Sequence, residues 1–107
     1  MVNTVNKGRR NEKRCRDELK DAGYMTYSPP RSKFGEQDIF GLFDVLAVYP
    51  HRQGIPPWGS PLLIQVKSNK CPAAVRRAIK EWDCGEQFRK MIWIWEDYKG
   101  WRKETIL

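Results

Sequence analysis

The chain has 107 residues, 40 % of them hydrophobic, and a net charge of +7. This length suits one compact domain over residues 1–107. No apolar run approaches the roughly 20 residues of a membrane helix, so we expect a cytoplasmic protein with no membrane span and no secretory signal. The basic excess favours a polyanionic partner, although a protein that is merely basic and soluble would share this composition.

The first half of the chain predicts one helix followed by two strands. Residues 8–22 are rich in helix formers, lack proline and carry apolar residues at helical spacing. Gly23 is typical of the position just beyond a helix C-terminus. We expect a strand over 24–28 and a central strand in the second half of 39–49, separated by a polar, proline-containing loop.

The second half predicts a strand, a helix and a β-hairpin. The strand covers 62–68, and the helix covers 72–84 with Pro72 in its first turn. Strands over 89–96 and 101–107 are joined by a short turn. The order is therefore αβββαββ, an α/β domain. The helix 72–84 should present an apolar stripe to the core, made of Ala74, Val75, Ala78, Ile79 and Trp82.

Polar side chains occur inside two of the predicted strands. Gln65 and Lys67 alternate with apolar neighbours in LLIQVKSNK and so share one strand face. Asp44 is flanked by apolar residues in LFDVLAV, and a buried carboxylate is costly unless it is paired or bound to a metal. Two other interpretations stay open: an aspartate held by backbone amides at a strand start, and a polar face on an edge strand.

These polar residues suggest a metal site if their two strands form a hairpin. Asp44 and Gln65 would then be neighbours, and carboxylate and amide oxygens are the ligands that Mg²⁺ prefers. Lys67, one pleat further along, would reach a metal-bound water or a phosphate. Zinc is not expected, because the three cysteines show no C-x-x-C spacing and the chain has one histidine.

These candidate residues, taken in their order along the chain, resemble those of a nuclease superfamily. Asp44 and the later Gln65-Val66-Lys67, after a basic helix carrying Glu12, resemble the PD-(D/E)xK nucleases, most closely the archaeal-type Holliday junction resolvases. KGRRNEKR is similar to the family's opening, LLIQVK to its Glu-x-Lys strand and GWR to its closing hairpin. This chain differs in having Gln65 at the second acidic position, and Asp38 is a rival for the role given to Asp44.

The resemblance implies a restriction-endonuclease-like core, with a mixed five-stranded sheet flanked by two helices. It implies a homodimeric, structure-selective DNA endonuclease of recombination and repair, cytoplasmic or nucleoid-associated, whose substrate is branched DNA. The implied catalytic residues are Glu12, Asp44, Gln65 and Lys67. Mg²⁺, or alternatively Mn²⁺, would be held by Asp44, Gln65, the Val66 carbonyl and, through water, Glu12. A related nuclease for flaps, nicks or duplex DNA and an inactive DNA-binding module are the alternative functions.

Basic residues cluster on the first helix and in the loop that precedes Asp44. Such side chains bind phosphates without reading sequence, although a charged helix face is often only solvated. The candidate DNA-binding residues, including a loop serine and lysine that resemble the family's, are Lys7, Arg9, Arg10, Lys13, Arg14, Arg31, Ser32 and Lys33.

Aromatic residues gather in the C-terminal part of the chain. Trp93 and Trp95 lie two residues apart and so share a strand face, where we expect Trp82 and Trp101 to join them. Clustered aromatics usually belong to a core or an interface. The hairpin around MIWIW and the second helix are therefore the expected contact surface of the homodimer.

Overall fold

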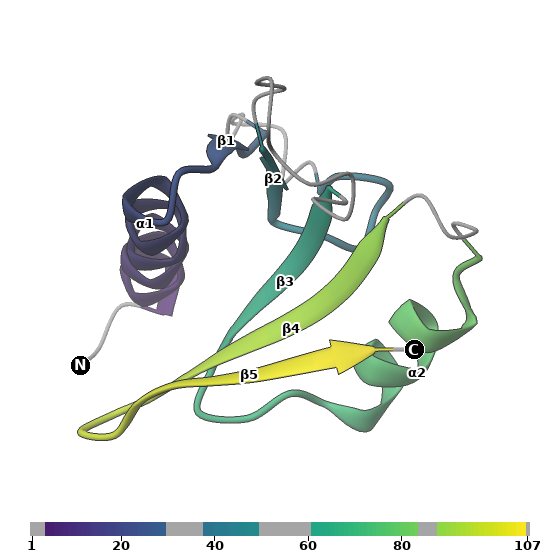
Figure 1. The fold of residues 1–107 in the computed structure, drawn as a ribbon. Helices are drawn as coiled ribbons and strands as arrows, with labels where there is room; N and C mark the ends of the chain where they lie inside the picture. The colour runs from purple at the N-terminus through teal and green to yellow at the C-terminus, as the bar shows by residue number, and fades with distance from the viewer. Residues whose placement is uncertain (1–3, 30–37, 50–60, 84–87, 107) are drawn as a thin grey trace.

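The computed structural model describes residues 4–29, 38–49, 61–83 and 88–106, with the side chains of 4–7 excepted. In this part of the chain, neither helix is long and apolar enough to cross a membrane. The predicted order of elements is confirmed (Figure 1). The elements are α1 (Thr4–Asp21), β1 (Met25–Tyr27), β2 (Val45–Val48), β3 (Leu62–Ser68), α2 (Ala73–Glu81), β4 (Arg89–Glu96) and β5 (Gly100–Ile106).

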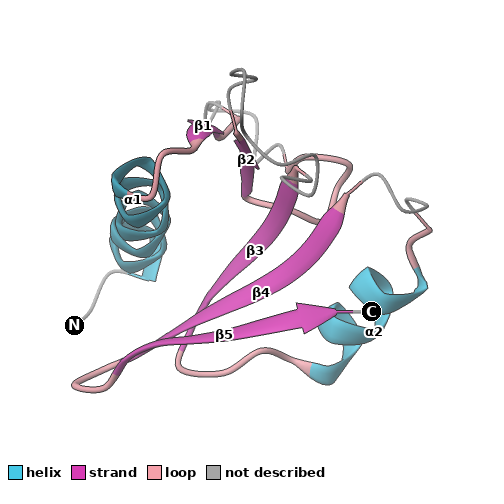
Figure 2. Cartoon of the chain, viewed as in Figure 1, coloured by secondary structure: helices cyan, strands magenta, loops and turns pink. Residues whose placement is uncertain are grey.

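The strands form one mixed sheet in the order β1-β2-β3-β4-β5. Only β3 and β4 are parallel, and α2 is the crossover between them, as parallel neighbours require. The predicted hairpin of β4 and β5 is confirmed by their antiparallel register. Figure 2 shows α1 and α2 at separate places beside the sheet, and each packs against its own set of buried side chains.

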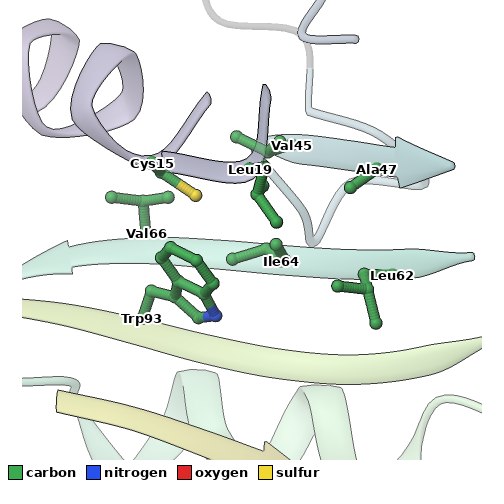
Figure 3. Close-up of a cluster of buried hydrophobic side chains, with 8 residues drawn as sticks. All are labelled: Cys15, Leu19, Val45, Ala47, Leu62, Ile64, Val66 and Trp93. Carbon is green, nitrogen blue, oxygen red and sulfur yellow. The ribbon is translucent and has the colours of Figure 1, made fainter. Parts of the chain in front are cut away.

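The first core lies between α1 and the sheet (Figure 3). Cys15 and Leu19 project from α1 onto alternate residues of β3, because every second side chain of a strand shares a face. Burial raises the pKa of the Cys15 thiol far above its ordinary value, so this cysteine is an uncharged core residue. The sheet side of this core comprises Val45, Ala47, Leu62, Ile64, Val66 and Trp93.

The second core lies between α2 and the opposite sheet face, and is built around Ile79 and Leu63. Trp82 belongs here, with its ring centroid 5.5 Å from that of Phe43. The prediction that Trp82 joins the other tryptophans is therefore wrong, because α2 covers the opposite face. Trp101 does lie where predicted, at centroid distances of 5.4 Å from Trp93 and 5.1 Å from Trp95. Ala74, also expected in the stripe of α2, is exposed instead.

The helix boundaries differ from the predicted ones in two places. α1 begins at Thr4, earlier than predicted, because its first residues contain no proline to stop the helix. It ends at Asp21, within one residue of the predicted end, and Gly23 follows with a φ of +99° that a side-chain-bearing residue would rarely adopt. α2 ends at Glu81, earlier than predicted, because Trp82 takes an extended conformation with ψ of 116°. Residue 84, the last of the predicted helix 72–84, lies outside the described residues.

Lys90 explains how α2 can end beside the sheet. Its side chain is buried, and Nζ donates hydrogen bonds to the carbonyl oxygens of Ile79 and Trp82, both at 2.7 Å, and of Lys80 at 3.2 Å. The last carbonyls of a helix have no partner within it, and a cation there also interacts favourably with the helix dipole.

Lys90→Met should therefore lower the free energy of unfolding by about 1–3 kcal/mol, the cost of leaving buried acceptors without a donor. Urea denaturation measures this loss. Lys80→Met is the matched control, because Lys80 is exposed on the same helix, and it should change stability by no more than about 0.5 kcal/mol. Equal losses in the two variants would contradict the capping role of Lys90.

Candidate functional site

Asp44 lies immediately before β2 and is held against β3 by two hydrogen bonds. Its N–H donates to the Ile64 carbonyl, and Oδ2 accepts from the Val66 N–H, each at 2.9 Å. β2 and β3 form the predicted antiparallel pair with Val45 opposite Ile64, and Asp44, just before the paired residues, is bonded to the backbone of both chain neighbours of Gln65. The amide-held aspartate that the sequence left open is thus present as well. A carboxylate has about four lone-pair positions, so one amide bond does not exclude a bound cation.

Gln65 and Lys67 lie on the face of β3 opposite Ile64 and Val66, which pack toward α1. The Gln65 side chain is only 7 % exposed, which is unusual for a glutamine. Lys67 is half-buried, near the end of β3. β2 begins at Val45, so the second half of β3 extends beyond the end of β2. The Gln65 and Lys67 side chains belong to this part of β3, which forms a corner of the sheet.

α1 reaches the same corner through a buried hydrogen bond. The Asn11 side chain is fully buried, and its Nδ2 donates to Ser68 Oγ at 2.6 Å. Asn11 precedes Glu12 and Ser68 follows Lys67, so this bond joins the chain neighbours of two candidate catalytic residues. Glu12 itself is half-buried. The segments that carry Glu12 and Lys67 thus meet at one end of β3, although Lys67 points to the face of the strand away from α1.

The pKa of Asp44 depends on its burial and on the charged side chains around it. Burial raises the pKa of Asp44 to about 7, and the Val66 N–H opposes that rise. The negative charges of Glu12 and Asp38 raise the pKa further, whereas the positive charge of Lys67 lowers it. At neutral pH this carboxyl is only partly ionised, and a bound divalent cation would favour its ionised form.

The donors at this corner fit a hard cation. Asp44 offers a carboxylate oxygen, Gln65 an amide oxygen and Glu12 a second carboxylate, and oxygen donors suit Mg²⁺ or Mn²⁺. The Val66 carbonyl points to the same sheet edge as its N–H, which is the edge where Asp44 lies. Within the described ranges, no three His, Cys, Asp or Glu side chains are close enough to hold a metal. A site here would therefore depend on the neutral oxygens of Gln65 and Val66.

Asp38, the rival aspartate, lies in a different setting. It is exposed, and its carbonyl accepts a hydrogen bond from the Gly41 N–H in a tight turn bounded by the bridge between Ile39 and Phe43. Asp44 is bonded to the β3 backbone on both sides of Gln65, and it is the more buried of the two aspartates. These two features make Asp44 the better candidate for a ligand.

The predicted DNA-binding residues fall into three groups. Arg9, Arg10 and Lys13 are exposed on α1, and Lys13 pairs with Asp17 at 2.7 Å. Arg14 instead faces the protein, because its guanidinium donates to Asn11 Oδ1 at 2.8 Å and lies 4.2 Å from the Trp95 ring centroid. The Lys7 side chain, Arg31, Ser32 and Lys33 lie outside the described residues.

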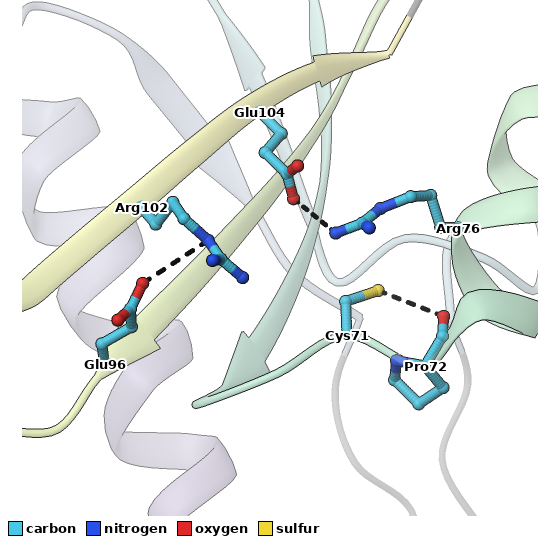
Figure 4. Close-up of polar contacts among 6 residues, drawn as sticks. All are labelled: Cys71, Pro72, Arg76, Glu96, Arg102 and Glu104. Atoms are coloured by element: carbon cyan, nitrogen blue, oxygen red, sulfur yellow. Dashed lines mark hydrogen bonds and ion pairs between the residues drawn. The ribbon is translucent and has the colours of Figure 1, made fainter.

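Ion pairs link the basic residues of α2 and β5 to carboxylates (Figure 4). Arg76 lies 2.6 Å from Glu104, and Arg102 lies 3.4 Å from Glu96. Exposed ion pairs of this kind contribute little to stability. They do neutralise part of the positive charge on this side of the molecule.

Asn11 and Ser68 were missed by the sequence interpretation. A usable signal was present, because Asn11 lies four residues before Cys15 and therefore on the buried stripe of α1. A polar side chain on such a stripe requires a hydrogen-bond partner. The sequence does not show that the partner is Ser68, which lies 57 residues away.

Asn11→Ala and Ser68→Ala should each destabilise the protein, with a coupling energy of about 1 kcal/mol between them. The coupling arises because either change removes the same hydrogen bond. A double-mutant cycle by urea denaturation measures it. Strictly additive losses would contradict the view that this bond fixes α1 on the end of β3.

Comparison with known proteins identifies the fold. The structure is similar to that of Hjc, a Holliday junction resolvase from the archaeal hyperthermophile Archaeoglobus fulgidus, with a TM-score of 0.60 and 20 % sequence identity. The match covers 94 % of this chain and 73 % of Hjc. No protein-family model and no curated protein sequence matches the chain. The predicted restriction-endonuclease-like fold is thus confirmed, a five-stranded mixed sheet with two helices.

Proposed function

We propose that this protein is a divalent-metal-dependent DNA endonuclease that cleaves branched DNA, with the Holliday junction as its preferred substrate. The observation that carries this proposal is that Asp44 is hydrogen-bonded to the β3 backbone on both sides of Gln65, with Lys67 two residues further along the same strand. Glu12 acts electrostatically on this carboxylate from α1. The fold shared with a Holliday junction resolvase supports the choice of substrate.

Each residue of the site has a separate role. Asp44, Gln65 and the Val66 carbonyl hold Mg²⁺ or Mn²⁺, with Glu12 assisting through water. When bound, the metal lowers the pKa of a water and neutralises charge on the phosphate. Lys67 orients the attacking water and stabilises the charge that develops on the phosphate oxygens in the transition state. By family resemblance, cleavage leaves a 5′-phosphate and a 3′-hydroxyl.

The exposed basic residues of α1 bind the DNA backbone next to this site. Arg9, Arg10 and Lys13 neutralise phosphates irrespective of sequence, as expected for an enzyme that recognises the shape of DNA. A four-way junction has two scissile phosphates related by two-fold symmetry, and a homodimer would match them. We propose that the β4–β5 hairpin and α2 contribute to the dimer contact, and that the protein acts in recombination and repair in the cytoplasm or nucleoid.

Gln65 favours one second candidate, a DNA-binding module without nuclease activity. A neutral ligand binds a cation more weakly than a carboxylate does, and loss of the second acidic residue could leave the fold without its chemistry. The Gln65 side chain is nevertheless buried, and it lies between the two β3 residues whose backbones are bonded to Asp44, as a positioned ligand would be. This placement favours the active enzyme.

One cleavage experiment separates the candidates. Four-way junction, flap, nicked and plain duplex DNA are each incubated with the protein and Mg²⁺, and again with EDTA in place of the metal. We expect Mg²⁺-dependent cleavage, fastest on the four-way junction. Faster cleavage of another DNA would assign a different substrate. Tight binding without cleavage of any DNA, in Mg²⁺ or Mn²⁺, would assign the inactive module.

A further inference from the structure

An open groove of about 750 Å³ lies between α1 and the chain that follows it. Residues 26–29, from β1 and the turn beyond, form one wall. The other wall is α1, which contributes one carboxylate, that of Glu12, and four cations, those of Arg9, Lys13, Arg16 and Lys20. Figure 1 shows α1 beside β1, the two elements that enclose this groove.

The four cations form a single line along the helix. Their spacing of four, three and four residues places them on one face of α1. With a rise of 1.5 Å per residue, the line from Arg9 to Lys20 is about 16 Å long. Phosphates of one DNA strand advance by about 3.4 Å per nucleotide along the helix axis, so the line matches about five nucleotides.

Hydrogen bonds and ion pairs hold two of these cations in place, one across the groove and one along the helix. Arg16 donates to Ser28 Oγ at 3.1 Å, which directs its guanidinium across the groove to the opposite wall. Lys13 is paired with Asp17 at 2.7 Å on the exposed side of the helix. The groove thus presents an ordered positive surface with one carboxylate, Glu12, and Glu12 is also the groove residue that acts on Asp44.

We propose that this groove binds the phosphodiester backbone of the DNA arm that leaves the candidate metal site, along the line of cations from Arg9 past Glu12 to Lys20. The inference rests on the proposed function and deepens it, because it adds Arg16 and Lys20 to the DNA contacts and gives the arm a direction. A phosphate backbone is favoured as the occupant because the cations repeat at a regular interval over several phosphates. An acidic protein segment would have no need of this regularity.

The test compares two double variants that each remove two positive charges. Arg16→Gln with Lys20→Gln alters the groove, whereas Arg77→Gln with Lys80→Gln alters exposed residues of α2. Affinity for a four-way junction is measured against salt concentration in EDTA, after both variants are shown to keep the wild-type oligomeric state. For the groove variant we expect affinity to fall by about tenfold or more and the log–log salt slope to decrease by about 1.8. The α2 variant should retain most of the wild-type slope.

The second part of the test varies the arm length of the junction and the charge of its backbone phosphates. Junctions with arms shorter than about five base pairs should bind the wild type and the groove variant almost equally. Neutral methylphosphonate linkages at successive positions along one arm should weaken the wild type but should not weaken the groove variant further. Equal effects of both double variants at every arm length, or strictly additive effects of the methylphosphonates, would overturn the inference.

This experiment is separate from the test of catalysis because it measures binding in the absence of metal. If the wild type binds junctions through the groove but cleaves nothing, the proposed nuclease fails and the groove assignment holds. If the wild type cleaves and the groove variant binds normally, the nuclease holds and the groove assignment fails. Binding of an acidic peptide in place of junction DNA, with the same loss in the groove variant, would also overturn the choice of occupant.

Discussion

Asp44→Asn should abolish DNA cleavage and leave DNA binding nearly intact. The change removes the charged oxygen that lies beside β3 at Val66 while keeping an oxygen that can accept the Val66 N–H. Single-turnover cleavage and a binding titration in EDTA separate the two effects. Asp38→Asn is the matched control, because Asp38 is an exposed aspartate in the preceding turn, and this variant should cleave at close to the wild-type rate. The opposite pattern would transfer the metal role to Asp38.

The pKa of Asp44 gives the same variant a second readout that does not need activity. Its pKa is raised to about 7 by burial, so the folded protein holds this proton more tightly than the unfolded chain does. The resulting stability is present at acid pH and is lost as pH rises through about 7, by up to about 4 kcal/mol. Asp44→Asn should therefore be more stable than the metal-free wild type at pH 8. Mg²⁺ should raise the melting temperature of the wild type there but not that of the variant.

Lys67→Ala should lower the cleavage rate by about 10²–10³ while metal binding persists. The ammonium group is positioned to stabilise charge in the transition state, and its charge opposes that of a cation beside Asp44. Metal affinity should therefore stay the same or increase. Lys70→Ala is the control, because Lys70 is an exposed lysine just beyond β3, and cleavage should stay within a few-fold of the wild type. A Lys67→Ala enzyme that needed much more Mg²⁺ would place Lys67 in a different role.

The elements of the fold were predictable where local patterns decide them. β3 and β4 have the predicted bounds, because apolar runs between turn residues mark buried strands. The end of α2 was not predictable, because it depends on Lys90, which reaches back from β4 to the last carbonyls. The position of Trp82 likewise depends on which sheet face α2 covers. Helical spacing shows which side chains share a stripe, but the crossover decides what that stripe contacts.

The candidate site was predictable in part. The alternation of Gln65 and Lys67 and the apolar surroundings of Asp44 indicated a shared corner, and the hydrogen bonds of Asp44 with the Ile64 and Val66 backbones bring Asp44 next to this part of β3. The role of Arg14 could not be predicted from its position among other basic residues, because its contacts with Asn11 and Trp95 are tertiary. The groove on α1 also depends on tertiary structure, since its second wall comes from the chain after the helix.

The central claim is that Gln65 serves as a metal ligand together with Asp44, and the Mg²⁺ dependence of cleavage in Gln65 variants tests it most directly. Gln65→Glu replaces a neutral oxygen with a charged one of similar size, so cleavage should reach its full rate at lower Mg²⁺. Gln65→Leu removes the ligand and should shift the curve to higher Mg²⁺ by at least about tenfold, since even indirect support of a metal is commonly worth that much. Coincident curves for Gln65→Leu and the wild type would contradict the metal-ligand role of Gln65.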